Sequence, residues 1–285
     1  MDRMRLLTAL LVPLLIGCTT VMEADQEPDW SDVDPPSLTP ASETLFDLIE
    51  MPPPAGRIPA AVYRFSDQTG QFRSGGQNNF STAVTQGAGS LLTSALVESE
   101  WFRPLEREGL QDLLTERRIL RQVQDQVPSL REARLIFEGG IIAYETNITT
   151  GGAGARYFGI GSNEEYRIDQ VMVNLRAVDV NSGEILASVD TTKTVYSHKI
   201  EGDIFRFVRD QRLLEAEAGY TRNEPRYLAT RDAIYSALVH LIVQGIANNH
   251  WRLEDDDDVD HPIIQAYWQE HMNRRDRNSA IEDDS

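Results

Sequence analysis

A single cysteine at the end of an apolar N-terminal stretch is the side chain of this sequence best placed for covalent chemistry. The cysteine closes the run Leu15-Ile16-Gly17-Cys18, and two arginines precede an apolar segment from Leu6 to Ile16. A basic start followed by an apolar run too short to span a membrane is typical of a secretory signal. Aliphatic and small residues before a cysteine favour lipoprotein processing, in which the thiol is acylated. We therefore expect residues 1–17 to be a removed signal peptide and Cys18 to carry the lipid.

This lipid defines the expected location. Each buried CH₂ of an acyl chain contributes ~0.8 kcal/mol to membrane binding, so an anchor with several chains is effectively permanent. Thr19 follows the cysteine, and the absence of aspartate there favours sorting to the cell outer membrane, with the folded part in the periplasm. A modified Cys18 leaves no thiol for a disulfide within the chain. The covalent lipid is the one non-protein group that we expect, and no other cofactor.

The remaining reactive side chains are not arranged for catalysis or metal binding. None of the histidines forms a His-Glu-x-x-His pair, and no Gly-x-Ser-x-Gly elbow occurs. The acidic run from Glu254 to Asp258 lacks the spacing and terminal glutamate of a calcium loop. We predict neither catalytic residues nor a metal site, and a protein that is not an enzyme. The histidines are His198, His240, His250, His261 and His271.

The net charge of -18 is concentrated at the two ends of the chain. Residues 19–56 contain nine acidic and no basic side chains, and residues 252–285 contain eleven acidic and four basic ones. We therefore expect a lipid anchor with an acidic linker over 18–56, a folded domain over 57–253 and an acidic C-terminal tail over 254–285. No basic stripe with interleaved aromatic residues is present, which argues against a nucleic-acid partner.

The middle of the chain predicts helices packed on a sheet. Ala60–Phe65 and Arg134–Ala143 read as strands, and Gly139-Gly140 in the second indicates a bulge or a close backbone approach. Apolar positions at helical spacing predict a helix capped by Ser81 or Thr82, a second helix over Leu110–Val123, and a last one around Ile234–Ile246. A hairpin turns at Asn181-Ser182-Gly183. This order of elements indicates an α+β fold.

Two polar stretches with strand-like alternation, Tyr144–Arg167 and Ser188–Arg212, do not fit a core. Arms of ~9 to 11 residues suit transmembrane β-hairpins, although the pattern equally fits long soluble hairpins. Two hairpins of one chain cannot close a barrel, since edge strands in lipid leave backbone groups unpaired. If these segments enter a membrane, the protein must form an oligomeric ring.

Several ordered blocks make the sequence resemble the family of curli secretion channel lipoproteins, CsgG, from about Phe46 to Leu253 and at the lipid-attachment motif. The blocks are Asp67-Gln68-Thr69-Gly70-Gln71-Phe72, Asn79-Phe80-Ser81-Thr82-Ala83-Val84, Trp101-Phe102-x-Pro104-Leu105-Glu106-Arg107, Gly154-Ala155-Arg156-Tyr157-Phe158-Gly159-Ile160-Gly161, Gln211-Arg212-Leu213-Leu214-Glu215 and Gly219-Tyr220-Thr221-x-Asn223-Glu224-Pro225.

The resemblance implies a periplasmic α+β domain whose two hairpins, near 144–168 and 188–212, join those of other protomers in one outer-membrane β-barrel built by a nonameric ring. It implies export of unfolded curli subunits, which form a functional amyloid, by diffusion without ATP. A periplasmic cap protein and an extracellular accessory factor are the further partners that it implies.

The resemblance also implies a pore constriction in the loop before the first long helix. Asn79 and Phe80 match the asparagine and phenylalanine of the family's stacked rings, and Gly75 stands where the family has a tyrosine. Without the resemblance, Phe80 could instead staple the start of the helix into the core. A lipid-anchored periplasmic scaffold or binding module, with soluble hairpins and no pore, is the alternative function.

Overall fold

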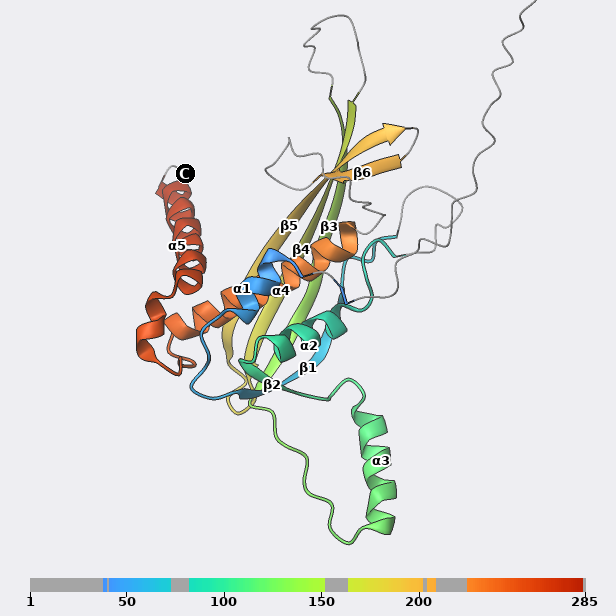
Figure 1. Cartoon of the computed structure of the whole chain (residues 1–285), viewed down its shortest axis with the longest axis vertical. Coiled ribbons are helices and arrows are strands. Elements are labelled where there is room, and N and C mark those ends of the chain that lie inside the picture. Colours follow the sequence, from blue (N-terminus) through green and yellow to red (C-terminus); the bar gives the residue numbers. More distant parts are fainter. Residues whose placement is uncertain are drawn as a thin grey trace, which may run out of the picture. The chain divides into compact units, whose positions relative to one another are not determined.

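Six strands form one sheet in the order β2-β1-β3-β4-β5-β6 (Figure 1). The computed structural model describes residues 38–39, 41–72, 82–151, 164–201, 204–208 and 225–283. β1 pairs in parallel with β2 and β3, and the other neighbours are antiparallel. The strands are β1 Ile58–Asp67, β2 Phe102–Leu105, β3 Leu135–Gly151, β4 Glu164–Asp179, β5 Ile185–Glu201 and β6 Ile204–Val208. The predicted strands and the α+β class are confirmed.

Helices cover one face of this sheet, as Figure 1 shows. α4 packs across β4 and β5, α2 packs on β1, and α1 lies against α2 and α4. The helices are α1 Glu43–Ile49, α2 Ala88–Glu98, α3 Leu110–Val123, α4 Pro225–Ala247 and α5 Pro262–Asp283, with a 3₁₀ turn, η2, at Asp256–Asp260. The predicted last helix is therefore α4, and it packs on the sheet as expected.

The core between α2, α4 and the sheet follows the alternation of the strands. Val171, Val173 and Leu175 of β4 are fully buried, while the residues between them are only partly buried. Leu92 of α2 and Leu238 of α4 are also fully buried. Because side chains on a strand point alternately to the two faces, a covered face selects every second residue as apolar.

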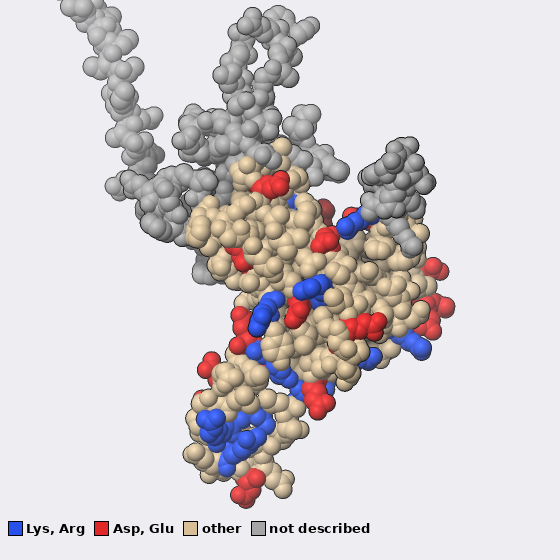
Figure 2. Space-filling model, turned by 180° about the vertical axis from the view of Figure 1, so that it is seen from behind, with Lys and Arg blue, Asp and Glu red and all other residues tan. Residues whose placement is uncertain are grey.

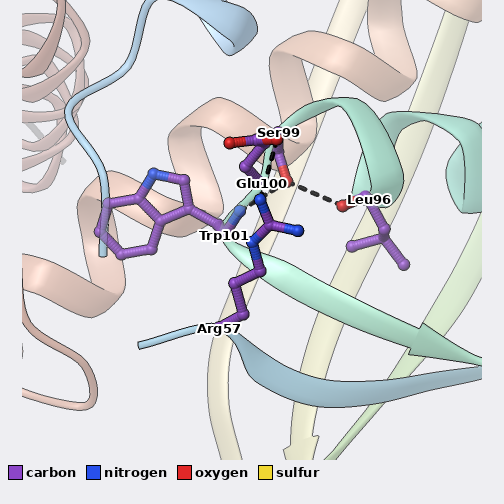
Figure 3. A network of polar contacts seen from close by, with 5 residues as sticks. All are labelled: Arg57, Leu96, Ser99, Glu100 and Trp101. Carbon is purple, nitrogen blue, oxygen red and sulfur yellow. Dashed lines mark hydrogen bonds and ion pairs between the residues drawn. The ribbon is translucent and has the colours of Figure 1, made fainter. Parts of the chain in front are cut away.

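The turn from α2 into β2 is held by a short polar network (Figure 3). Ser99 Oγ donates to the Leu96 carbonyl over 3.0 Å and accepts from Trp101 N over 3.3 Å. Glu100 has a positive φ of 56° and pairs with Arg57 over 2.8 Å. Trp101, fully buried, donates through Nε1 to the Pro52 carbonyl over 3.0 Å. The network therefore holds the turn in place where the chain leaves α2 and enters β2, the strand that pairs with β1.

The start of α2 corrects one prediction. The helix begins at Ala88 after Gly87, and neither Ser81 nor Thr82 caps it. Thr82 instead forms an isolated bridge with Phe72, and its hydroxyl donates to the Val84 carbonyl over 3.0 Å. A side chain that hydrogen-bonds locally in a turn is not available to a helix N-terminus.

The folded domain also begins earlier than predicted, inside the expected linker. Ser42 caps α1, and its Oγ accepts from Leu45 N over 3.4 Å. Leu45 and Leu48, three residues apart on one helix face, are buried. The acidic composition of 18–56 concealed these two residues, whose burial in the core docks the helix.

The predicted C-terminal tail contains η2 and α5, and α5 includes the short helix that the apolar and aromatic residues of Ile263–Met272 predict. Ile264 is buried, and the Tyr267 hydroxyl donates to Asp47 Oδ2 of α1 over 2.8 Å. The Tyr267 ring contacts the His240 ring of α4 edge to face, with centroids 4.6 Å apart. These contacts place α5 against α1 and α4, which a count of charges could not predict.

Acid is expected to weaken the docking of α5. Burial lowers the pKa of His240, which the Glu270 carboxylate, 3.5 Å away, opposes and His271 and Arg274 reinforce. The unfolded chain then binds a proton that the folded chain does not, so stability falls as the pH drops below about 6.5. The Gln265 amide of α5 donates to the His261 carbonyl over 3.0 Å, and its protection factor, which corrects for the slower intrinsic exchange in acid, should fall between pH 7.5 and pH 5.5.

His240→Asn is the control for this pH dependence. The variant keeps a polar side chain on α4 but cannot titrate, so the protection factor at α5 should change less between the two pH values. An equal change in both proteins would contradict the role of His240.

Among the described helices, none combines the length and apolar character needed to cross a membrane. Likewise, the described part of the chain contains no cluster of three or more histidine, cysteine or acidic residues that could hold a metal ion.

Candidate functional site

The candidate constriction residues Gly75, Asn79 and Phe80 lie outside the described residues, but both ends of their loop are described. Phe72 and Thr82 form an antiparallel bridge, and Ala83 N donates to the Gln71 carbonyl over 2.8 Å. The chain therefore leaves and returns at one closed point. We call residues 67–72 and 82–86 the neck of this loop.

Asp67 organises the neck at the end of β1. Its Oδ1 accepts from the backbone N of Thr69 over 2.8 Å and from the Thr69 hydroxyl over 2.7 Å. Its Oδ2 accepts from Gln86 Nε2, on the returning side of the loop, over 3.1 Å. One carboxylate thus connects the outgoing and returning segments, and hydrogen bonds to a charged acceptor are stronger than those between neutral groups.

Gln68 joins the neck to β3. Its backbone N donates to the Ile141 carbonyl over 2.9 Å, and its Nε2 donates to the Gly139 carbonyl over 2.8 Å. The approach needs a residue without a side chain at Gly140, because a Cβ there would lie 2.1 Å from the Ser66 carbonyl oxygen. The predicted close backbone approach at Gly139-Gly140 is confirmed.

Asp67→Ala is expected to open the neck without unfolding the sheet. The substitution removes three hydrogen bonds, of which each contributes roughly 1–2 kcal/mol at most. Amide hydrogen exchange at Thr69 and Ala83 should accelerate at least tenfold, whereas exchange at Val173 in the core should not change. Asp67→Asn, which retains one acceptor oxygen, should give a smaller effect; equal effects of both variants would contradict this account.

The two predicted hairpin segments coincide with long strands that are continuous with the sheet. β3 and β4 pair from Leu135↔Asp179 to Gly151↔Glu164, and β5 and β6 pair from Tyr196↔Val208 to Glu201↔Ile204. The rest of the segments 144–168 and 188–212, namely 152–163, 202–203 and 209–212, lies outside the described residues. In Figure 1 the strands extend past the helices that cover the sheet.

A buried carboxylate lies in the first of these strand pairs. Asp169 of β4 is fully buried, and its Oδ1 accepts from the Tyr144 hydroxyl over 2.8 Å and from the Thr146 hydroxyl over 2.7 Å. A register shift of one residue would turn this carboxylate to the other face and break both bonds, so the group specifies how β3 and β4 pair.

Asp169 is a buried residue that the sequence patterns did not single out, although a signal was present. Asp169 has the same strand parity as Val171 and Val173, so it occupies an inward position in an otherwise apolar series. An acidic residue on the covered face of a strand requires buried partners. On β5, Thr191 is also buried and donates to the Ala233 carbonyl of α4 over 2.8 Å.

The lipid-anchor candidate Cys18 lies outside the described residues, so the described site consists of the neck and the long strands. This arrangement offers no group of side chains arranged for catalysis. The neck adjoins β3, and residues 73–81 between its two sides lie outside the described part of the chain.

Comparison with known proteins assigns the chain to a family. The sequence profile described as "Curli production assembly/transport component CsgG" matches residues 41–271. The protein of that name from Salmonella typhimurium is 44% identical over 273 residues, which cover 92% of this chain and 96% of the relative. The protein of that name from Escherichia coli K12 is 43% identical over 277 residues, covering 94% and 97%.

A distant likeness exists to a solved structure, the PelC dodecamer from Paraburkholderia phytofirmans, with 14% identity and a TM-score of 0.27 over 65% of this chain and 87% of that one. The assignment rests on the sequence matches, which include both sides of the neck and all described strands. The chain belongs to the CsgG family of curli production assembly and transport components, which is not a family of enzymes.

Proposed function

We propose that this chain is the subunit of an oligomeric outer-membrane channel that exports unfolded curli subunits. The observation that carries the proposal is the family match over residues 41–271, because it is continuous through the neck, the constriction loop and both hairpin segments. A relative named for curli transport that shares all of these parts supports a role in curli secretion.

The pairing of the strands supports assembly into a ring. β1 ends at Asp67, opposite Ile141, so among the described residues β3 beyond Ala143 pairs on one side only, with β4. β6 pairs only with β5 in the described part of the sheet. The part of the sheet beyond Ala143 therefore has two open edges, one at β3 and one at β6. Pairing the β6 edge of one copy with the β3 edge of the next would satisfy the backbone hydrogen-bonding groups of both. Nine such copies are the ring that we propose.

The neck supports a constriction built by the loop. Each subunit would hold its loop 73–81 at the same height, so that Asn79 and Phe80 form rings around the axis. Amide groups can hydrogen-bond to an unfolded backbone, and phenylalanine rings limit the width. Gly75 adds no side chain, so this channel would lack the family's third ring.

Passage through such a pore needs no ATP. An unfolded subunit would diffuse through the opening, with direction given by confinement on the periplasmic side and by fibre assembly outside. A periplasmic cap and an extracellular accessory factor are the partners proposed for these two steps. A lipid on Cys18 would hold each subunit at the membrane.

Planar-bilayer conductance of the purified mature protein tests the pore. Wild type should give stable current steps, and Phe80→Ala and Asn79→Ala should each give larger steps because the ring widens. Phe46→Ala is the matched control, since it removes an exposed phenylalanine of α1 and should leave the step unchanged. Oligomers that never conduct would favour the scaffold function, and steps of equal size in all variants would exclude this loop as the constriction.

A further inference from the structure

In the part of the chain that the structure describes, helix α3 lies outside the packed core. None of its residues is buried, and no described helix or strand packs against it. Four of its apolar side chains are largely exposed: Leu114 at 41%, Ile119 at 51%, Leu120 at 41% and Val123 at 80%. A helix of 14 residues is marginal alone in water, and its stability in a protein comes mainly from packing of one face. α3 therefore needs a partner.

The return segment 124–134 shapes this helix without covering it. The Arg117 guanidinium donates to the Pro128 carbonyl, and Arg107 donates to the Arg131 carbonyl over 2.8 Å. These contacts hold α3 as an arm that projects from the β2 end of the sheet (Figure 1). The return segment thus fixes the position of the exposed surface of α3.

The exposed surface of α3 is basic along one side. Leu114, Arg118 and Arg121 are spaced four and three residues apart and share a helix face, and all three are exposed. The acidic residues Asp112 and Glu116 lie on the opposite side of the helix, together with Ile119, Leu120 and Val123, so Leu114 is the exposed apolar residue that belongs to the basic stripe. Figure 2 shows basic side chains gathered on the lobe that contains α3. A partner for this stripe should combine carboxylates with apolar surface.

Such a surface exists elsewhere on the same chain. A hollow of about 700 Å³ is lined by Pro53, Ala55, Arg252, Leu253, Glu254, Asp255, Asp256 and Asp258. Its base is fixed, because Ala55 N donates to the Arg252 carbonyl over 3.0 Å and Glu254 N donates to the Pro53 carbonyl over 2.9 Å. Four carboxylates and one guanidinium thus surround a floor of proline, alanine and leucine.

We propose that α3 of one subunit docks in this hollow of a second copy of the chain. The arginines of α3 would meet the carboxylates, and Leu114 would meet the apolar floor. The two surfaces belong to different parts of the subunit: α3 projects to one side of the sheet, and the segment leading into α5 lies on the other (Figure 1). A contact between unlike surfaces repeats head to tail and closes into a ring when the rotation permits.

The inference rests on the oligomer of the proposed function but not on its pore. It adds a periplasmic interface that is separate from the pairing of hairpin strands. Docking of α3 would align neighbouring subunits through water-exposed surfaces, whether or not the hairpins have met in the membrane.

Cysteine cross-linking in the full-length chain tests the contact. Leu114→Cys with Ala55→Cys should give a ladder of disulfide-linked multimers on mild oxidation in membranes, and either cysteine alone should not. The sequence offers no competing thiol beyond Cys18. A faster-migrating cross-linked monomer, or no ladder although rings form in native electrophoresis, would overturn the inference and leave the proposed channel intact.

Charge reversal in the same cross-linking background tests the chemistry. Arg118→Glu with Arg121→Glu should reduce the multimer yield at least tenfold, as should Glu254→Lys with Asp256→Lys. Combining all four in one chain should restore the ladder, because every interface then carries reversed but complementary charges. Asp112→Lys with Glu116→Lys, on another side of α3, is the matched control and should change the yield less than twofold.

The acidic linker is the competing occupant. The chain with Arg118→Glu and Arg121→Glu is then combined with Asp29→Lys and Asp32→Lys in the linker. If these linker changes restore the multimer ladder and the charge reversals in the hollow do not, α3 binds the linker and the inference is wrong. Unchanged yields in all reversed chains would also overturn it. Conductance of each variant, measured separately, distinguishes these failures from a failure of the proposed channel.

Discussion

Gly140→Ala is expected to abolish the native junction between the sheet and the neck. Gly140 has a φ of +153°, and an added Cβ would lie 2.1 Å from the Ser66 carbonyl oxygen and 2.9 Å from Gln68 Nε2. Ser66 is positioned by pairing with β3, so the backbone of β1 must move, and the Gln68 side chain must turn away. Unusual backbone conformations cost about 1–3 kcal/mol, and the steric clash adds to this cost. We expect a loss of about 3 kcal/mol or more, a large part of a typical protein's stability.

Thermal denaturation of the detergent-solubilised protein measures this loss, and Gly183→Ala is the control. Gly183 also has a positive φ, of +73°, but an added Cβ meets nothing within 4 Å. It should therefore cost only the backbone term, about 1–2 kcal/mol. If both variants lost the same stability, the close approach of β1 to Gly140 would not be the cause.

Gly245→Ala is expected to displace Trp251 from the end of α4. A Cβ at this position would lie 1.9 Å from a ring atom of Trp251. The indole cannot easily yield, since its Nε1 donates to the Ile242 carbonyl over 2.8 Å and its ring packs edge to face with Phe102, centroids 6.2 Å apart. Overpacking of a core typically costs ~1–3 kcal/mol, and loss of the buried hydrogen bond adds roughly 1 kcal/mol.

A double-mutant cycle with Trp251→Ala separates the steric cause from helix propensity. Trp251→Ala alone should cost ~3–5 kcal/mol because it leaves a cavity. In that background Gly245→Ala should be nearly neutral or stabilising, since alanine favours a helix interior by about 1 kcal/mol over glycine. A Gly245→Ala effect that is equally large without the indole would refute the proposed clash.

Local patterns predicted most of the sheet and its helices. Alternation around Val171 and Val173 predicted a half-covered strand, and apolar spacing through Leu238 predicted a helix facing it. Both predictions are confirmed because side chains repeat every 2 residues along a strand and about every 3.6 residues along a helix, so the buried face shows directly in the sequence. The adjacent glycines at 139 and 140 predicted a close approach, which the structure locates against the backbones of β4 and β1.

Composition misled at both ends of the domain. Acidic residues around Leu45 and Leu48 suggested a linker, and those after Glu254 suggested a tail, yet α1 and α5 are helices in contact with each other. The apolar residues that dock them are few, and their contribution depends on α2 and α4, which are distant in the sequence and against which these helices pack. Charge density measures solvation and does not detect such anchors.

Local spacing and ordered motifs were enough to predict the family, the α+β class and the strands other than β2, and to nominate Cys18. The family resemblance nominated Gly75, Asn79 and Phe80. Tertiary structure alone decided which distant segments meet. It closed the neck through Asp67 and Gln86, buried Asp169 against Tyr144, and left α3 without a buried residue among the described elements. The reason is physical: local propensity acts over a few residues, whereas hydrogen bonds and burial depend on groups that only the folded chain brings together.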